Sequence, residues 1–204
     1  MRRTDWDQYY SAPVPTAFLS RAVVRHRLLR LIRETGSAPE RSIAELGGGG
    51  SCFCEAIRNR FNTKEYTAYD SSKLGLQKFL RKNPDCRTVM TDLLSWNPET
   101  QYDLVFSVGL IEHFQESDTE IMIRKHFEMT KPGGYVIILV PTPTLLYRIT
   151  RKIAESGRLW KFPDERPVSA AELKKTADTC GICLNSFTIY ANFLSQYAVL
   201  YRKI

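Results

Sequence analysis

Residues 42–51 are Ser-Ile-Ala-Glu-Leu-Gly-Gly-Gly-Gly-Ser, a short apolar run followed without a break by four glycines, Gly47–Gly50. The run has the length and composition of a buried β-strand, and the residues after it are helical in pattern to about Phe61. The glycines therefore occupy a strand-to-helix turn, where a backbone without side chains can come within contact distance of a ligand. This stretch predicts an α/β protein with a ligand-binding loop after its first strand.

Strands and helices alternate outward from this point. Further strand-like runs occur at residues 65–69, 87–90, 102–108 and 135–140, and helical patterns at residues 15–33, 71–82, 116–130, 144–161 and 169–180. The last two β-rich runs, 183–190 and 196–202, are joined by too few residues for a parallel crossover, so we expect an antiparallel hairpin at the sheet edge. We predict a single domain over residues 1–204, an α/β Rossmann-like fold. Its seven-stranded sheet is mostly parallel with an antiparallel last strand, and helices cover both faces.

The composition favours a soluble protein of the cytoplasm. The chain has 204 residues, 43% of them hydrophobic and 25% charged, which is the balance of a globular domain. It contains no run of about 18 apolar residues and begins without the apolar stretch of a signal peptide. Five cysteines, an odd number, fit free thiols in a reducing compartment. Cys180 and Cys183 have metal-like spacing, but no second ligand pair accompanies them, so we predict no metal site.

Polar residues follow the predicted strands. Asp70 follows the second strand, Asp92 the third, and residues 107–112 the fourth. In an open α/β sheet, ligands bind beyond the carboxyl ends of the strands, and an acid after the second strand is the usual partner of a ribose diol. The dinucleotide fingerprint G-x-G-x-x-G fails here, because Cys52 or Phe53 stands where its last glycine belongs. The glycine run alone is also compatible with a tight turn that binds nothing.

The ordered set of motifs resembles that of class I S-adenosylmethionine-dependent methyltransferases. Glu45–Ser51 is similar to their first motif, acid-x-Gly-x-Gly-x-Gly, with Ser51 in place of the third glycine. Asp70 resembles their ribose-binding acid, and Met90-Thr-Asp-Leu93 their adenine-binding motif. The segment Tyr102–Phe114 resembles their fourth motif, and Lys131-Pro-Gly-Gly-Tyr135 the turn before their fifth strand. Because Ser51 opens the next predicted helix, where serine can cap, we expect cofactor binding to survive this departure.

The resemblance implies that S-adenosyl-L-methionine is the cofactor and S-adenosyl-L-homocysteine the product. It places the glycines beneath the methionine part, with the first acid orienting the loop or the cofactor's amino group. The acid after the second strand would take the ribose hydroxyls, and the residues after the third and fourth strands would hold the adenine and line the methionine side. The implied cofactor-binding residues are Glu45, Gly47, Gly48, Gly49, Asp70, Ser71, Asp92, Leu93, Ser107 and Val108.

A general base is needed only if the methyl acceptor arrives protonated. His113, just past the fourth strand, is the first candidate, because histidine changes charge near neutral pH, and Glu112 is the second. The Ile-Glu-His-Phe segment is shared by relatives with unrelated substrates, so His113 is also compatible with a packing role. His26 and His126, on predicted helices beside basic residues, are expected to be solvated.

The positive charge is concentrated in two segments. The net charge is +7, and residues 1–35 and 144–175 each carry a surplus of four basic side chains. In the family these regions cover the acceptor site, so we expect residues 1–35 to form a helical cap and residues 144–168 a lid. Leu145, Leu146, Ile149 and Ile153 form one face of the second segment, beside Arg148, Arg151 and Lys152. That face could seat on the body as a lid or lie on an anionic membrane surface; we favour a lid over a small, anionic acceptor.

Two other functions stay open. One is RNA methylation, which the charge and aromatic residues would support. However, the sequence contains no appended RNA-binding module and lacks the Asn/Asp-Pro-Pro-aromatic signature of base-amino methylation. The other is a non-catalytic module that binds adenosylmethionine and regulates a partner. The acceptor atom and the oligomeric state are not determined by these residues.

Overall fold

The computed structural model describes residues 4–11, 17–36, 40–157, 159–191 and 194–204. Pro15, the predicted start of the first long helix, lies outside these residues. Seven strands form one sheet in the order β3-β2-β1-β4-β5-β7-β6. They are β1 (Arg41–Leu46), β2 (Thr63–Asp70), β3 (Arg87–Met90), β4 (Tyr102–Val108), β5 (Thr130–Pro141), β6 (Gly181–Ala191) and β7 (Leu194–Lys203).

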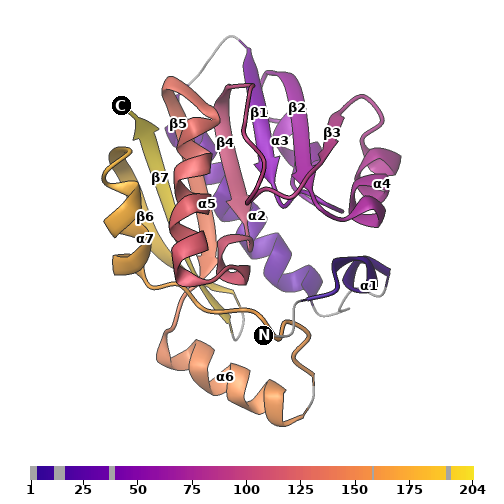
Figure 1. The fold of residues 1–204 in the computed structure, drawn as a ribbon, viewed down its shortest axis with the longest axis vertical. Helices are drawn as coiled ribbons and strands as arrows, with labels where there is room; N and C mark the ends of the chain where they lie inside the picture. The colour runs from indigo at the N-terminus through magenta and orange to yellow at the C-terminus, as the bar shows by residue number, and fades with distance from the viewer. Residues whose placement is uncertain (1–3, 12–16, 37–39, 158, 192–193) are drawn as a thin grey trace.

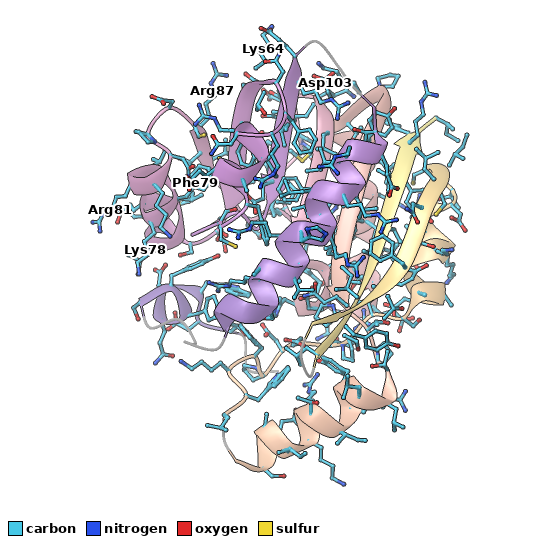
Figure 2. The ribbon with its side chains drawn as sticks, turned by 180° about the vertical axis from the view of Figure 1, so that it is seen from behind. Lys64, Lys78, Phe79, Arg81, Arg87 and Asp103 are labelled. Carbon is cyan, nitrogen blue, oxygen red and sulfur yellow. The ribbon has the colours of Figure 1, made fainter. Side chains whose placement is uncertain are left out.

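The described helices surround this sheet. They are α1 (Trp6–Ser11), α2 (Ala17–Glu34), α3 (Cys54–Arg58), α4 (Lys73–Lys82), α5 (Glu116–Glu128), α6 (Leu145–Ser156), α7 (Ala170–Ala177) and the 3-10 turn η1 (Ile111–His113). Figure 1 shows α5 in front of the sheet, and Figure 2 shows α2 crossing the opposite face. Two apolar cores lie between these layers, one under α2, α3 and α4, the other under α5 and α7.

The strand directions confirm the predicted fold. β1, β2, β3, β4 and β5 pair in parallel, whereas β7 runs antiparallel to both β5 and β6. The C-terminal hairpin therefore closes one edge of the sheet, as expected from its short connection. β1 lies between β2 and β4. The order of strands along the chain reverses there, so a crevice for a ligand opens at the carboxyl ends of β1 and β4.

His126 departs from its predicted place on the surface. It is fully buried in α5, where Nε2 lies 2.8 Å from the Ser107 hydroxyl and Nδ1 lies 2.7 Å from the Met122 carbonyl oxygen. Burial lowers the pKa of its imidazole to about 4, so the ring is neutral near pH 7. The spacing of Met122, Ile123 and Phe127, all buried, places His126 on the inner face of the helix.

The orientation of α6 also corrects an expectation. Leu145, Ile149 and Ile153 are 76%, 50% and 68% exposed, so the apolar face of this helix points away from the protein instead of seating on it. Tyr147, on the opposite side, is buried and donates its hydroxyl hydrogen bond to Glu165. Figure 1 shows α6 beyond the carboxyl ends of the parallel strands. In the part of the chain described by the structure, no helix is long and apolar enough to cross a membrane.

Candidate active site

The glycine loop after β1 is fixed to the neighbouring strand and helix. Gly47 and Gly48 both donate their N–H groups to the Tyr69 carbonyl oxygen, at 2.8 and 3.0 Å, and Gly50 donates to the Gly75 carbonyl oxygen at 2.9 Å. Gly47 and Gly50 have φ angles of +72° and +63°, which residues with a Cβ adopt at a cost. The four glycines thus form an ordered turn at the carboxyl ends of the central strands.

Asp70, the last residue of β2, is held in place by hydrogen bonds from this loop and from the residues that follow it. Its Oδ2 accepts the Gly49 N–H at 2.7 Å, its Oδ1 accepts the Ser72 N–H at 2.8 Å, and the Tyr10 hydroxyl donates to Oδ2 at 3.2 Å. The side chain is buried, and burial raises its pKa although these donors act in the opposite direction. A buried carboxylate with a hydroxyl group already donating to it has the chemistry required for a ribose diol.

Most of the residues implied for the cofactor line one cavity of about 1860 Å³. Its volume exceeds the roughly 300–1,000 Å³ typical of a site for one small ligand, so it has room for a cofactor and an acceptor. Glu45, Gly47, Gly49, Asp70 and Ser71 line it from β1, β2 and the turns after them, and Asp92 and Leu93 line it after β3, the neighbour of β2. Val108, Glu112 and His113 line it after β4, on the other side of β1.

Three predicted details differ in the structure. Gly48 does not line the cavity, and Ser107 is fully buried with its hydroxyl bonded to His126, so its side chain does not line the methionine side. Ser51 does not cap a helix: α3 starts at Cys54, and the Ser51 Oγ accepts the Phe53 N–H at 3.1 Å. The glycine loop therefore continues past Ser51 before the helix begins.

Glu45 is buried in the wall of the cavity beneath the loop. Burial raises its pKa to about 7, while hydrogen bonds from Tyr66 and Ser51 act against that rise. A cationic amino group placed beside this carboxyl would favour its ionised form. The residue type and position thus fit the implied role of Glu45 toward the amino group of the methionine part.

Gly49 shows how closely the loop is fitted to its surroundings. A Cβ built at this position would lie 2.5 Å from Asp70 Oδ2 and 2.8 Å from the Tyr10 hydroxyl oxygen. Only a residue without a side chain therefore lets the loop pack this closely against Asp70 and Tyr10. This cradle, together with the buried Asp70, fits an adenosine-containing cofactor.

We expect Gly49→Ala to destabilise the protein by about 1–3 kcal/mol, because the new methyl group overpacks this contact, and to weaken binding of S-adenosylhomocysteine. Urea unfolding and calorimetric titration measure the two effects. Gly157→Ala is the matched control, since a Cβ at that position would meet no atom closer than 3.6 Å. Equal affinities for the two variants would contradict the close fit.

His113 lies in η1, at the end of β4, with its ring held by a carboxylate. Its Nδ1 is 3.0 Å from Asp164 Oδ1, and its Nε2 is 3.9 Å from Glu112 Oε1. Asp164 also accepts the backbone N–H of Thr4 at 2.8 Å and the Thr4 hydroxyl. Burial acts to raise the pKa of Asp164, but the hydrogen bond from His113 and those from Thr4 hold this pKa well below the usual range. An ionised Asp164 accepts a hydrogen bond from Nδ1–H, which leaves the lone pair on Nε2.

The charges around His113 favour its protonation. Burial lowers the pKa of the imidazole, but the hydrogen bond to Asp164 and the negative charges of Glu112, Asp164 and Glu165 outweigh burial, so the pKa lies above its ordinary value. Glu112 is itself buried, and burial raises its pKa to about 7. No group in the described part of the chain bonds to Glu112 Oε2. That oxygen is a place where a polar group of a ligand would gain a hydrogen bond.

Aromatic side chains from the two predicted covering segments surround His113. Trp6 in α1 meets the imidazole edge-on with ring centroids 4.7 Å apart, and Phe162 is 5.7 Å away. Tyr9 contacts Phe162 at 5.2 Å, so the N-terminal helix and the segment after α6 meet over the site. The aromatic residues of these segments indicated in the sequence that they cover the site, whereas no sequence pattern indicated that Asp164 contacts His113.

The N-terminal helix α1 is attached to the cofactor side of the cavity as well. Asp7 accepts a hydrogen bond from the Ser72 hydroxyl, and the Lys78 ammonium donates to the Tyr10 carbonyl oxygen. Figure 2 shows Lys78 projecting from α4 on the side of α1. Burial, followed by the negative charge of Asp70, raises the pKa of the Tyr10 phenol, so its hydroxyl stays protonated and donates to Asp70. Sequence reasoning did not identify Tyr10 as a partner of Asp70.

The basic side chains of α6 do not form the expected positive roof. Arg148 and Lys152 are exposed and do not line the cavity. Arg151 donates to the Glu165 carbonyl oxygen at 2.7 Å and forms an ion pair with Glu155 at 2.7 Å. The charged side chains beside His113 are instead acidic, namely Asp164 and Glu112.

Comparison with known proteins agrees with this geometry. The family described as methyltransferase domain matches residues 19–181. Trans-aconitate 2-methyltransferase of Variovorax paradoxus is 27% identical over 139 residues, which are 66% of this chain and 50% of that protein. Malonyl-[acyl-carrier protein] O-methyltransferase 1 of Ilyobacter polytropus is 28% identical over 105 residues, 50% of this chain and 38% of that protein. The chain spans about half the length of the curated relatives it matches.

Solved structures share the fold at low sequence identity. Magnesium protoporphyrin IX methyltransferase of Synechocystis PCC 6803, with bound S-adenosylhomocysteine, superposes with a TM-score of 0.76 at 14% identity, over 98% of this chain and 93% of that chain. N-methyltransferase NodS of Bradyrhizobium japonicum WM9, also with S-adenosylhomocysteine, has a TM-score of 0.68 at 14% identity, over 88% of this chain and 85% of that chain.

The glycine loop after β1, the acid ending β2 and the reversed β7 define the fold of the class I S-adenosylmethionine-dependent methyltransferases. The chain belongs to the methyltransferase-domain family, which matches most of its length. S-adenosylmethionine is the cofactor of this class, and the residues around the cavity fit it.

Proposed function

We propose that this chain transfers the methyl group of S-adenosylmethionine to a small-molecule acceptor whose reacting oxygen or nitrogen atom carries a proton. The observation that supports this most directly is the arrangement of His113. Its Nδ1 is bonded to Asp164, and the ring lines the same cavity as Gly49 and Asp70. An imidazole held in this way takes up a proton at Nε2 from a nucleophile beside it.

The bound cofactor supplies a methyl group on a positively charged sulfur, which leaves as a neutral thioether when the acceptor attacks. The protein contributes position and proton transfer. Holding the acceptor in line with the methyl group lowers the activation free energy by up to about 7–11 kcal/mol. The proton leaving the acceptor goes to His113 Nε2, and Asp164 stabilises the resulting imidazolium through Nδ1. The ring packing of Trp6 and Phe162 keeps the imidazole in this orientation.

A second candidate is a small anionic acceptor that is methylated on a carboxylate oxygen. It is favoured by the similarity to trans-aconitate 2-methyltransferases, whose name specifies a carboxylic acid substrate. A carboxylate is already ionised near pH 7 and needs no base. The acidic surroundings of His113 support the first candidate, because Glu112, Asp164 and Glu165 repel an anion at the reacting end.

The test is to incubate the protein with S-adenosylmethionine labelled in its methyl group and with a small-molecule extract. We expect label in products that survive mild alkali, as methyl ethers and methylamines do. Labelled methanol released by alkali would identify a carboxyl methyl ester and favour the second candidate. Label confined to the RNA of an unfractionated lysate, or cofactor binding without transfer to any acceptor, would contradict both.

A further inference from the structure

The outer face of α6 carries a stripe of exposed apolar side chains. Leu145, Ile149 and Ile153 lie on one face of the helix; we call these three residues the α6 stripe. Their exposed fractions are 76%, 50% and 68%. Single exposed apolar residues are ordinary, but a continuous row on one helix marks an interaction surface.

The helix is held with this stripe outward. Thr144 caps it by accepting the Tyr147 N–H at 3.2 Å, and the buried Tyr147 donates its hydroxyl to Glu165. Arg151 donates to the Glu165 carbonyl oxygen at 2.7 Å, and its guanidinium lies 5.4 Å from the centre of the Trp160 ring. Rotating the helix to bury the stripe would break these contacts and expose Tyr147. The stripe is therefore available to a partner outside the domain.

The charges beside the stripe identify the kind of partner. Arg148 and Lys152 are exposed, and the helical spacing of 100° per residue places both along one edge of the stripe. The acid of this helix, Glu155, is engaged by Arg151 at 2.7 Å. We propose that α6 binds an anionic lipid surface, with the α6 stripe entering the boundary between headgroups and acyl chains. Arg148 and Lys152 then meet the negative headgroups, as in interfacial amphipathic helices.

A second copy of the chain fits this face less well. A stable protein interface takes about 20–30 residues a side, whereas the stripe has three apolar side chains. Lipid binding requires no more than a short apolar face with cations at its border. The opposite face of α6 lines the active-site cavity through Tyr147, Thr150 and Ala154, so the helix connects the proposed membrane surface to the site.

The proposal is tested by sedimentation with extruded vesicles and does not depend on methyl transfer. We expect the protein to bind vesicles of phosphatidylcholine mixed with an equal amount of phosphatidylglycerol, and to bind pure phosphatidylcholine at least about tenfold more weakly, since each basic residue near an anionic surface contributes about 1 kcal/mol. The combined variant Leu145→Ser, Ile149→Ser, Ile153→Ser and the variant Arg148→Glu, Lys152→Glu should each lose at least about tenfold in vesicle affinity.

The matched control is Ile182→Ser with Leu184→Ser, two apolar side chains on β6 that are 58% and 48% exposed. It should bind vesicles like the unmodified protein, and thermal unfolding should show that all variants fold. Equal vesicle binding by the unmodified protein and the α6 variants would overturn the proposal. So would a dimer in solution that the serine variant dissociates while the protein binds no vesicles.

Discussion

Replacing Asp70 with alanine is expected to weaken the binding of S-adenosylmethionine by at least about 100-fold. Two ribose hydroxyl groups would each donate to this carboxylate, and a hydrogen bond to a charged group is worth about 1.5–3 kcal/mol. The side chain is buried and its two oxygens are aimed by the Gly49 and Ser72 N–H groups, at 2.7 and 2.8 Å. The binding geometry therefore exists before the cofactor arrives. Calorimetric titration with S-adenosylhomocysteine measures the loss.

Two controls separate this loss from a folding defect. Asp70→Asn keeps one oxygen as an acceptor but leaves either the Gly49 or the Ser72 N–H without its acceptor, so it should lose about 1–3 kcal/mol of stability and bind the cofactor more weakly because the charge is gone; urea unfolding checks that it is folded at the temperature of the titration. Asp85→Ala removes an exposed acid outside the cavity and should leave the affinity unchanged. If Asp70→Ala binds S-adenosylhomocysteine within a few-fold as tightly as Asp85→Ala does, the Asp70 carboxylate does not hold the ribose.

The cofactor side of the cavity was predictable because it depends on local sequence and on a topological rule. An apolar strand, a glycine loop and an acid ending the next strand are each visible within a few residues. Because β1 and β2 pair in parallel, Gly49 and Asp70 then lie together at the carboxyl ends of these strands. Tyr10 lies 60 residues from Asp70 in the sequence, on a helix whose position depends on contacts with α4, so no local pattern connects the two residues.

The acceptor side of the cavity was less predictable, because its contacts also join residues that are far apart in the sequence. Asp164 lies in an irregular segment 51 residues from His113, and its approach depends on Thr4 at the other end of the chain. The period of α6 predicted an amphipathic helix correctly. The helix was expected to turn its apolar face toward the protein, but that face points outward. Its orientation is set by the hydrogen bonds of Tyr147 and Arg151 to Glu165, a residue outside the helix. Hydrophobic periodicity does not reveal bonds of that kind.

Replacing His113 with alanine is expected to lower kcat/KM for methyl transfer by about 10²–10⁴-fold, the usual contribution of a general base. Binding of S-adenosylhomocysteine should stay unchanged, because Asp70 and the glycine loop are intact. His26→Ala, at an exposed position on α2, is the matched control and should keep full activity. A His113→Ala variant with nearly full activity would favour the carboxylate acceptor, for which no proton has to be removed.

The pH profile distinguishes a base from a residue that only packs. A base works in its neutral form, so kcat/KM should rise with pH through the raised pKa of His113 and level off above it. Asp164→Asn removes the negative partner of Nδ1 while burial still lowers the pKa of His113, so the rising limb should move to lower pH. The plateau should fall as well, because an asparagine amide can donate to Nδ1 and so favour the tautomer with its proton on Nε2. If His113 only packs, Asp164→Asn should lower the rate without moving the rising limb of the pH profile. That result would show that His113 is not the base.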